Sequence, residues 1–342
     1  MPLRNKHINL GWPLTITLVI CLVISIRFGA VDINTAEIFS ALKKTVTGDA
    51  LTLNERIFML IRFPRAVLCL ITGAALAVGG VLMQGLFRNP IVEPGLLGTS
   101  SGAAFGAALY FVLGAGLKLS TGSYTLPVAA CLGALLSTGM VYMIAPQGNG
   151  TKNSALPLLL TGIAVNAIFL SAVGFLSYIA RDPQARSITF WSLGSLSGAN
   201  WQVCFITGTS TILCCLASLF YARQLNALTI GEDEATLLGV NITRLKISVL
   251  LINVVMIATA TAFAGIISFV GLIVPHLLRM LKGSDNRMLI INGALMGGIV
   301  LSLSDLTARM LLHPAELPIG IVTSVVGAPV FIYLLRRNTY FF

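Results

Sequence analysis

Charged residues are scarce in this sequence. Asp, Glu, Lys and Arg make up 10% of its 342 residues, whereas hydrophobic residues make up 56%. A typical soluble domain has about 25% charged residues, so the composition excludes an ordinary soluble fold. The mean hydropathy of +0.91 indicates the same. We therefore expect an all-α, polytopic membrane protein, with residues 1–342 forming a single transmembrane domain.

Acidic residues are the rarer of the two charge types. Twelve Asp and Glu face 22 Lys and Arg, for a net charge of +10. The basic residues stand singly or in pairs between apolar runs, which argues against nucleic-acid binding. Only Asp305 falls within an apolar segment, and Arg309 follows at the spacing that allows a pair on one helix face. Ion-coupled transporters usually carry intramembrane carboxylates, so an ion-coupled secondary transporter is disfavoured but stays an alternative.

Motifs for catalysis and metal binding are missing. The chain has no G-x-x-x-x-G-K-[ST] phosphate loop and no H-E-x-x-H sequence, so we expect no ATP hydrolysis by this chain and no enzymatic activity. The six cysteines lie in apolar runs without C-x-x-C spacing, and the three histidines are far apart. We expect no bound metal or cofactor, although the role of His313, in a loop between two apolar runs, stays open. A membrane-embedded enzyme is correspondingly disfavoured.

Long apolar runs account for most of the chain. A bilayer core needs roughly 20 apolar residues per helix, and the charge and Pro/Gly clusters divide the sequence into about ten such segments. They are residues 12–31, 64–87, 95–115, 126–145, 155–180, 202–222, 245–265, 267–282, 288–310 and 317–335. Pro275, Pro318 and Pro329 predict kinked or shortened helices in the eighth and tenth segments. Residues 186–201 predict a short interfacial helix, with Trp191 and Trp201 as boundary anchors.

The distribution of basic residues gives a topology. With the N-terminus in the cytoplasm, Lys and Arg are slightly more frequent on the inner side, as the positive-inside rule requires. Ten spans then place both termini in the cytoplasm and Arg62, Arg65 and Arg309 outside. Pairs of small residues at helical spacing predict close helix packing. These pairs are Gly73 with Ala77, Gly102 with Gly106, and Gly293 with Gly297.

The longest polar segment on the predicted inner side is residues 223–246, RQLNALTIGEDEATLLGVNITRLK. It shows two short helical patterns, and Gly231 separates them just before an acidic first turn. Ala235, Leu237 and Leu238 then form an apolar patch. The segment is either an ordinary connection or a pair of helices that docks a cytosolic partner.

Six longer motifs resemble one known family in order and spacing. They are RFPRAV at 62–67, GVLMQGLFRNPIVEPGLLGTSSGAAFGAAL at 80–109, FWSLGSLSGANW at 190–201, IGEDEATLLGV at 230–240, FVGLIVPHLLRML at 269–281 and PAELPIGIVTSVVGAPVFIYLL at 314–335. They resemble the permease subunits of bacterial ABC importers for iron chelates, haem and vitamin B12, the FecCD or type II importer family. The likeness covers nearly the whole chain.

The resemblance implies a homodimer of ten-helix subunits in a bacterial inner membrane. It also implies two copies of a cytosolic ATPase, which bind ATP and Mg²⁺, and a periplasmic substrate-binding protein. Substrate would move inward by alternating access. The resemblance ranks haem first, a ferric siderophore second and vitamin B12 third as the substrate.

The resemblance also assigns roles to particular positions. It implies that Arg62, Arg65 and Arg309 dock the binding protein. It implies that the residues coupling the permease to the ATPase are Gly231, Glu232, Ala235, Leu238 and Gly239. It also implies that Asn89 and Pro90 form the cytoplasmic gate, with residues 149–154 as a companion loop.

Overall fold

The computed structural model describes residues 10–29, 33–114, 122, 124–145, 155–312 and 315–337, and all regular elements in these ranges are helices. In chain order they are α1 (Gly11–Arg27), α2 (Thr35–Thr47), α3 (Leu53–Ile57), the π-helical turn η1 (Phe58–Arg62), α4 (Phe63–Phe87), the 3₁₀ turn η2 (Pro94–Leu97), α5 (Thr99–Leu113), α6 (Thr125–Ile144), α7 (Ala155–Ile179), α8 (Asp182–Ser192), α9 (Trp201–Ile230), α10 (Glu232–Leu237), α11 (Ile242–Ala264), α12 (Val270–Lys282), α13 (Asn286–Met310) and α14 (Ile319–Arg337).

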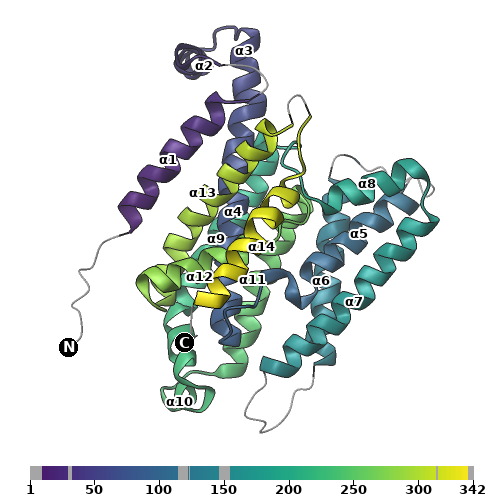
Figure 1. Cartoon of the computed structure of the whole chain (residues 1–342), viewed down its shortest axis with the longest axis vertical. Coiled ribbons are helices and arrows are strands. Elements are labelled where there is room, and N and C mark those ends of the chain that lie inside the picture. Colours follow the sequence, from purple (N-terminus) through teal and green to yellow (C-terminus); the bar gives the residue numbers. More distant parts are fainter. Residues whose placement is uncertain are drawn as a thin grey trace.

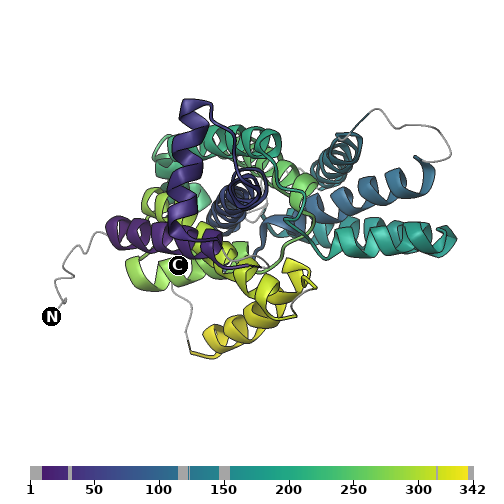
Figure 2. The same cartoon turned by 90° about the horizontal axis from the view of Figure 1, so that it is seen from above.

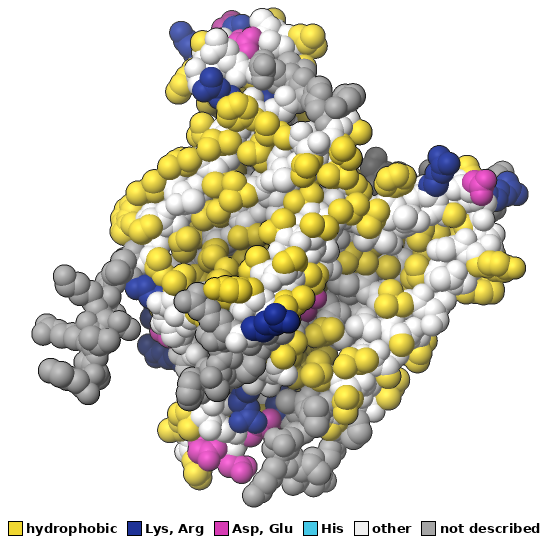
Figure 3. Space-filling model, in the orientation of Figure 1, with side chains coloured by type: hydrophobic (Ala, Val, Ile, Leu, Met, Phe, Trp, Pro, Cys, Tyr) yellow, Lys and Arg dark blue, Asp and Glu magenta, His cyan; other side chains and the backbone are white. Residues whose placement is uncertain are grey.

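Each of the ten predicted spans contains one of these helices. Six helical stretches in the described ranges are long and apolar enough to cross a bilayer, and α1, α5 and α14 are shorter apolar helices. The remaining predicted span, the eighth along the chain, contains α12. This helix has 13 residues with Pro275 inside it, as the sequence predicted for that segment. Hydrophobic side chains cover the middle of the molecule, whereas charged side chains gather mainly towards its ends (Figure 3). The chain is therefore an all-α, multi-pass membrane protein.

Helix α4 is the central element. It contacts α9, α11, α12 and α13, and these helices surround it in both views (Figures 1 and 2). Gly73 of α4 and Gly297 of α13 face each other so closely that a Cβ atom on either would collide with the carbonyl oxygen of the other. Small residues let the two backbones approach where lipid provides no hydrophobic drive for helix association. This confirms the close packing predicted for these positions.

Helices α5 to α8 form a second group beside α4 (Figures 1 and 2). Here α5 packs closely on α6. Cβ atoms on Gly102 and Gly106 would collide with the backbone of Gly133 and Ala129, so glycine is needed at these positions. At Gly293 the prediction of close packing was wrong, since an added Cβ would meet no backbone and only two side chains, Val81 at an ordinary 3.4 Å and Leu278 at 3.9 Å.

Two short helices, α2 and α3, cover one end of the molecule, and the sequence analysis did not predict them. Ile33, Ala41 and Phe58 form a small apolar core beneath them. At the start of α3 the Glu55 carboxylate accepts a hydrogen bond from the Thr52 backbone N–H at 2.7 Å. Such reciprocal caps are a helix-start signal, and the sequences NTAE at 34–37 and TLNE at 52–55 carry it.

Two boundaries differ from the predictions. The interfacial helix predicted for residues 186–201 starts earlier, and α8 covers only Asp182–Ser192. Helix α9 continues to Ile230, eight residues beyond the predicted end of its span. The first half of the polar segment 223–246 is thus an extension of a membrane helix. Its second half contains α10, and Gly231 separates the two as predicted.

Candidate docking, gate and coupling sites

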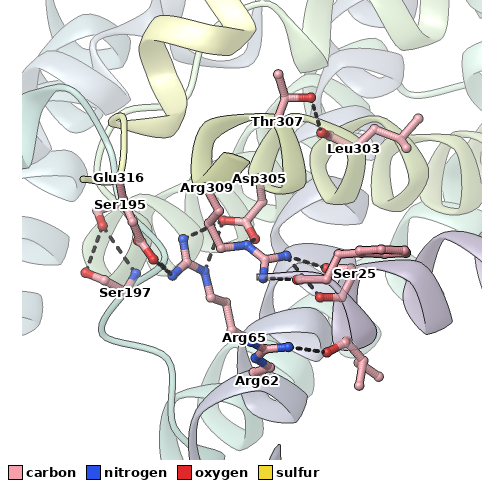
Figure 4. A network of polar contacts seen from close by, with 12 residues as sticks. Ser25, Arg62, Arg65, Ser195, Ser197, Leu303, Asp305, Thr307, Arg309 and Glu316 are labelled. Carbon is pink, nitrogen blue, oxygen red and sulfur yellow. Dashed lines mark hydrogen bonds and ion pairs between the residues drawn. The ribbon is translucent and has the colours of Figure 1, made fainter. Parts of the chain in front are cut away.

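Arg65 lies at the centre of a polar network at the end of the molecule that carries α2 and α3 (Figure 4). Its Nε and Nη2 atoms donate to Oδ1 of Asp305 at 3.1 and 2.9 Å. Its Nη1 atom donates to both carboxylate oxygens of Glu316, at 3.1 and 2.9 Å. Arg65 of α4 therefore joins α13 to the segment that precedes α14, through charge-assisted hydrogen bonds.

Arg309 shares the same carboxylate. Its Nε atom lies 2.9 Å from Oδ2 of Asp305, which is the i,i+4 pair that the sequence predicted. Its Nη2 atom also donates to the carbonyl oxygen and hydroxyl of Ser25, and Nη1 donates to the carbonyl oxygen of Phe28. Arg62 donates from Nη1 to the carbonyl oxygens of Ile26 and Arg27, at 2.9 Å each.

The C-terminal end of α1 explains these contacts. The last carbonyl groups of a helix have no partner within it and carry partial negative charge, and two arginines supply donors to them. As a result the side chains of Arg62 and Arg309 are only 7% and 8% exposed. The Arg65 side chain is only slightly more accessible, at 11%, and the expected placement of all three arginines on the outer side of the membrane stays a prediction. The docking role of the three residues stays a prediction.

Two acidic residues complete this network and were not predicted as part of a site. Asp305 is 1% exposed and lies between two guanidinium groups, whereas the Glu316 side chain is 44% exposed at the rim. The spacing of Asp305 and Arg309 gave a signal for their pair. Nothing in the sequence indicated that Arg65, 240 positions away, would share that carboxylate, because the contact depends on the packing of α4 against α13.

The coupling segment lies at the opposite end of the molecule (Figure 1). Gly239 follows the C-cap of α10 with a φ of 84°, and the backbone N–H groups of Gly239 and Val240 donate to the carbonyl oxygens of Thr236 and Ala235. This Schellman arrangement requires a residue that tolerates positive φ, which explains the glycine.

The predicted coupling contacts differ in exposure. Ala235 is fully buried, and Glu232 is held by Lys246, with Nζ and Oε1 2.9 Å apart. Leu238 is 65% exposed, and Leu237, which was not among the predicted contacts, is 88% exposed. Two adjacent exposed leucines on a polar segment indicate a surface for a protein partner. In this segment Ala235 and Glu232 position α10, and the two leucines face outward.

The gate corner follows α4. Arg88 ends that helix in the left-handed conformation, with φ 50° and ψ 38°. The Asn89 side chain accepts a hydrogen bond from the backbone N–H of Ile91 at 3.0 Å, and Pro90 is buried. The corner is thus locally ordered by Asn89. Residues 149–154, predicted as its companion, lie outside the described residues, as does His313.

Polar side chains also join the breaks between α4, η2 and α12. Glu93 accepts a hydrogen bond from the backbone N–H of Phe269 at 3.0 Å, at the start of α12. Phe269 has φ 70°, a costly conformation for a bulky residue. Gln84 donates to the carbonyl oxygen of Leu272 and Asn253 to that of Pro94. This cluster could not be predicted from the sequence, because its members are scattered over four segments.

No three His, Cys, Asp or Glu side chains gather as metal ligands among the residues that the structure describes. The ion pairs among these residues lie instead at two ends of the molecule, around Asp305 and α3 at one end and beside α10 at the other. A bundle of long, short and broken helices with polar ends defines the protein as an α-helical, multi-pass transport protein.

The chain belongs to the FecCD transport family, whose model matches residues 17–337. It is 41% identical over 334 residues to the hemin transport system permease protein HmuU of Yersinia pestis, covering 98% of this chain and 97% of that protein. It is 39% identical over 276 residues to the cobalamin import system permease protein BtuC of Halobacterium salinarum, covering 81% of this chain and 72% of that protein.

A solved structure shares the whole fold. It is an inward-facing conformation of a transporter assigned to the metal-chelate type of ABC transporters. The TM-score is 0.83 at 31% sequence identity, and the match covers 96% of this chain and 99% of that one. The protein is therefore a permease of the ABC importer class with the type II fold, as the six motifs predicted.

Proposed function

We propose that this permease carries haem from the periplasm to the cytoplasm. The observation that supports haem is the end-to-end match to the hemin permease, at 41% identity over 98% of this chain. The match to the cobalamin permease from Halobacterium covers only 81% of this chain, so we rank cobalamin below haem. A ferric siderophore or another iron chelate is the second candidate, because the similar solved structure is of the metal-chelate type.

A growth experiment separates these substrates. Cells that lack the gene are grown in three media. The first supplies iron only as haem, the second supplies iron only as a ferric siderophore, and the third supplies iron salts but makes growth depend on imported cobalamin. We expect growth to fail with haem alone and to return when the wild-type gene is supplied on a plasmid. Normal growth on haem together with failure on the siderophore or on cobalamin would contradict the haem assignment.

We further propose that the permease works as a homodimer with two cytosolic ATPase subunits and a periplasmic binding protein. Helix α7 supports the dimer, because only 22% of its most apolar window is buried within one chain. The ATPase subunits would bind ATP and Mg²⁺, and this chain would perform no bond chemistry. Alternating access requires that the ATPase binds the inward and outward states with different free energies.

The orientation we propose places both termini in the cytoplasm of a bacterium, with the protein in the inner membrane. The starting end of α1 and the final end of α14 are, for each helix, the end that points towards α10 (Figure 1). Helices α2 and α3 then lie on the periplasmic side. The Arg65 network is on this periplasmic side, and the leucines of α10 are on the cytoplasmic side.

For docking of the binding protein we propose a division of labour among the three arginines. Arg65 makes the direct contact, because its side chain, at 11% exposed, is the most accessible of the three and is paired with Glu316, whose side chain is 44% exposed. Arg62 and Arg309 shape the rim from within by holding the end of α1. Arg65→Glu should weaken binding of the periplasmic partner at least tenfold, and added salt should weaken wild-type binding.

Arg56 provides the matched control for Arg65. It is an exposed arginine of α3 on the same side of the molecule. Binding is measured by surface plasmon resonance with the binding protein encoded beside this gene. Equal losses for Arg56→Glu and Arg65→Glu would show a general charge effect, and no loss for Arg65→Glu would refute the direct contact.

For coupling we propose that Leu237 and Leu238 insert into an apolar groove of the ATPase. Leu237→Ser together with Leu238→Ser should abolish co-purification of the ATPase without lowering the thermal stability of the permease, because both side chains are exposed. Leu281→Ser, at the end of α12, is the control because Leu281 is also exposed. Retention of the ATPase by the double variant would rule out this contact.

For the gate we propose that Asn89 and Pro90 of the two copies approach each other on the cytoplasmic side of the transport path. The local order that Asn89 imposes on the corner supports this role. With an added oxidant such as copper phenanthroline, a single Asn89→Cys variant should form a disulfide between subunits in the substrate-free state and fail to form it when the ATPase is nucleotide-bound before oxidation. Absence of the cross-link in both states would contradict the assignment.

A further inference from the structure

A hollow of about 530 Å³ lies where α9, α10 and α11 meet. Its lining includes Phe220, Arg223 and Gln224 of α9, Gly239 after α10, and Asn241 and Arg244 at the start of α11. The coupling proposal above uses Leu237 and Leu238, and Leu238 also lines this hollow. The two arginines of this hollow have no part in that proposal.

The hollow lies at the level of a lipid headgroup. Helix α9 has 30 residues and rises about 45 Å, whereas a hydrocarbon core is about 30 Å thick. Trp201 marks one end of α9, since tryptophan favours the membrane boundary. Roughly 20 residues further on, the helix leaves the hydrocarbon, shortly before Arg223. The guanidinium of Arg223 is therefore placed beside the phosphate layer.

An apolar stripe leads along α9 to the hollow. Phe205, Ile212, Leu216 and Phe220 are all exposed and follow one another at intervals that keep them on one helix face. Arg223 and Gln224 come next, three and four residues after Phe220. One surface of α9 thus passes from a lipid-facing stripe to a basic hollow.

The two arginines are available to a ligand. Both are exposed, and neither side chain has an ion pair or hydrogen bond to another of the residues that the structure describes. Nearby Lys246, in contrast, is paired with Glu232. The hollow also meets the start of α11, a 23-residue helix whose N-terminal end carries partial positive charge.

We propose that this hollow binds the phosphate headgroup of an anionic phospholipid such as phosphatidylglycerol, with an acyl chain along the Phe205–Phe220 stripe. Basic pockets between helices on the cytoplasmic side are suited to such headgroups. Each arginine near an anionic lipid contributes about a fivefold gain in affinity, so two together give roughly 30-fold. The lipid would brace α9 against α11 beside the coupling helix α10.

Native mass spectrometry of the purified permease tests this proposal. Phosphatidylglycerol and phosphatidylethanolamine with the same acyl chains are titrated onto the wild type, the double variant Arg223→Gln with Arg244→Gln, and Arg287→Gln. Arg287 is an exposed arginine at the start of α13 and serves as the control. We expect the wild type and the control to bind phosphatidylglycerol about 30-fold more tightly than phosphatidylethanolamine, and the double variant to lose this preference.

Two other results would overturn the assignment. If the double variant still prefers phosphatidylglycerol, the lipid binds elsewhere on the protein. If the wild type binds both lipids equally, the hollow is a site for a protein partner and not for an anionic lipid. Soluble glycerol phosphate is added as a competitor in millimolar amounts, and we expect no displacement because it lacks the acyl chain. Full displacement would show a site for free phosphate esters and would refute the role of the stripe.

Discussion

At the scale of single residues, Asp305 balances two guanidinium groups from different helices. It is 1% exposed, and its two oxygens face Arg65 of α4 and Arg309 of α13. A buried ion pair contributes little net stability, but removal of one partner leaves an uncompensated charge. The carboxylate is therefore the member of the network whose loss has the largest structural consequence.

Asp305→Asn should lower the free energy of unfolding by about 3–5 kcal/mol, the usual effect of breaking a buried pair. Thermal unfolding of the purified permease in detergent measures the loss. The double variant Asp305→Asn with Arg309→Gln should recover part of it, because one of the unbalanced charges is removed. An unchanged melting temperature for Asp305→Asn would contradict the buried network, and Arg56→Gln provides the exposed control.

The sequence predicted the local part of this site and missed the distant part. The pair of Asp305 and Arg309 followed from helical spacing, and the arginines at 62 and 65 stood out at the start of an apolar helix. Their burial did not follow, because it depends on the position of the α1 C-terminus, whose carbonyl groups take up the donors. Partners such as Glu316 become visible only when α4, α13 and the segment before α14 are packed together.

At the scale of elements, α2 and α3 form a cap held by polar contacts. The Asn54 side chain donates to Glu37 at 2.9 Å, and so does the backbone N–H of Asn34. These hydrogen bonds, that of Asn54 first, hold the pKa of the Glu37 carboxyl below its ordinary value of 4.5. Because the folded pKa is the lower one, the contribution to stability is complete above the unfolded pKa and is lost as the pH falls through the folded value.

Acidification should therefore loosen the cap selectively. Below a pH of about 4.5 we expect faster hydrogen exchange in residues 33–57 than in α4, after correction for intrinsic exchange rates. Glu37→Gln should show less dependence on pH over the same window, because one of two titrating groups is gone and only Glu55, whose pKa is lowered to about 2 chiefly by the hydrogen bond from Ser40, still contributes. The same pH dependence in the wild type and in Glu37→Gln would contradict this role of Glu37.

Glycine contacts between α4 and α13 give a second prediction at this scale. A Cβ at Gly297 would collide with the backbone of Gly73, so Gly297→Ala should destabilise the protein by about 1–3 kcal/mol through overpacking. Gly139→Ala in α6 is the matched control, since nothing lies within 4 Å of that position. Thermal unfolding compares the two, and equal melting temperatures would refute the close α4–α13 packing.

Helix positions were largely predictable, and the short elements were not. Hydropathy placed a helix in each of the ten predicted spans because a lipid-exposed backbone must be satisfied within its own helix. The cap helices α2 and α3 were not predicted because their apolar core is small and their helix-start signals are short. The extension of α9 escaped because Arg223 looks like the end of a span, although the helix continues for seven residues beyond it.

At the scale of the whole molecule, the two functional ends are linked by a tightly packed centre. Helix α4 begins near the Arg65 network and ends at the Arg88–Pro90 corner, and 83% of its most apolar window is buried. Interiors packed at this density transmit displacements rather than absorb them. Under the orientation and roles proposed above, binding of the periplasmic partner at one end and the nucleotide state at the other end can thus bias the same helices.

Haem import driven by ATP, as proposed for this permease, is measured as the initial rate of haem uptake into cells. Cells without the chromosomal gene, complemented with the wild type or with an empty plasmid, receive radioiron-labelled haem. We predict cytoplasmic accumulation only with the wild-type gene, loss of uptake when ATP is depleted, and continued uptake when only the proton gradient is collapsed. Uptake that survives ATP depletion and stops with the proton gradient would contradict the account and indicate an ion-coupled transporter.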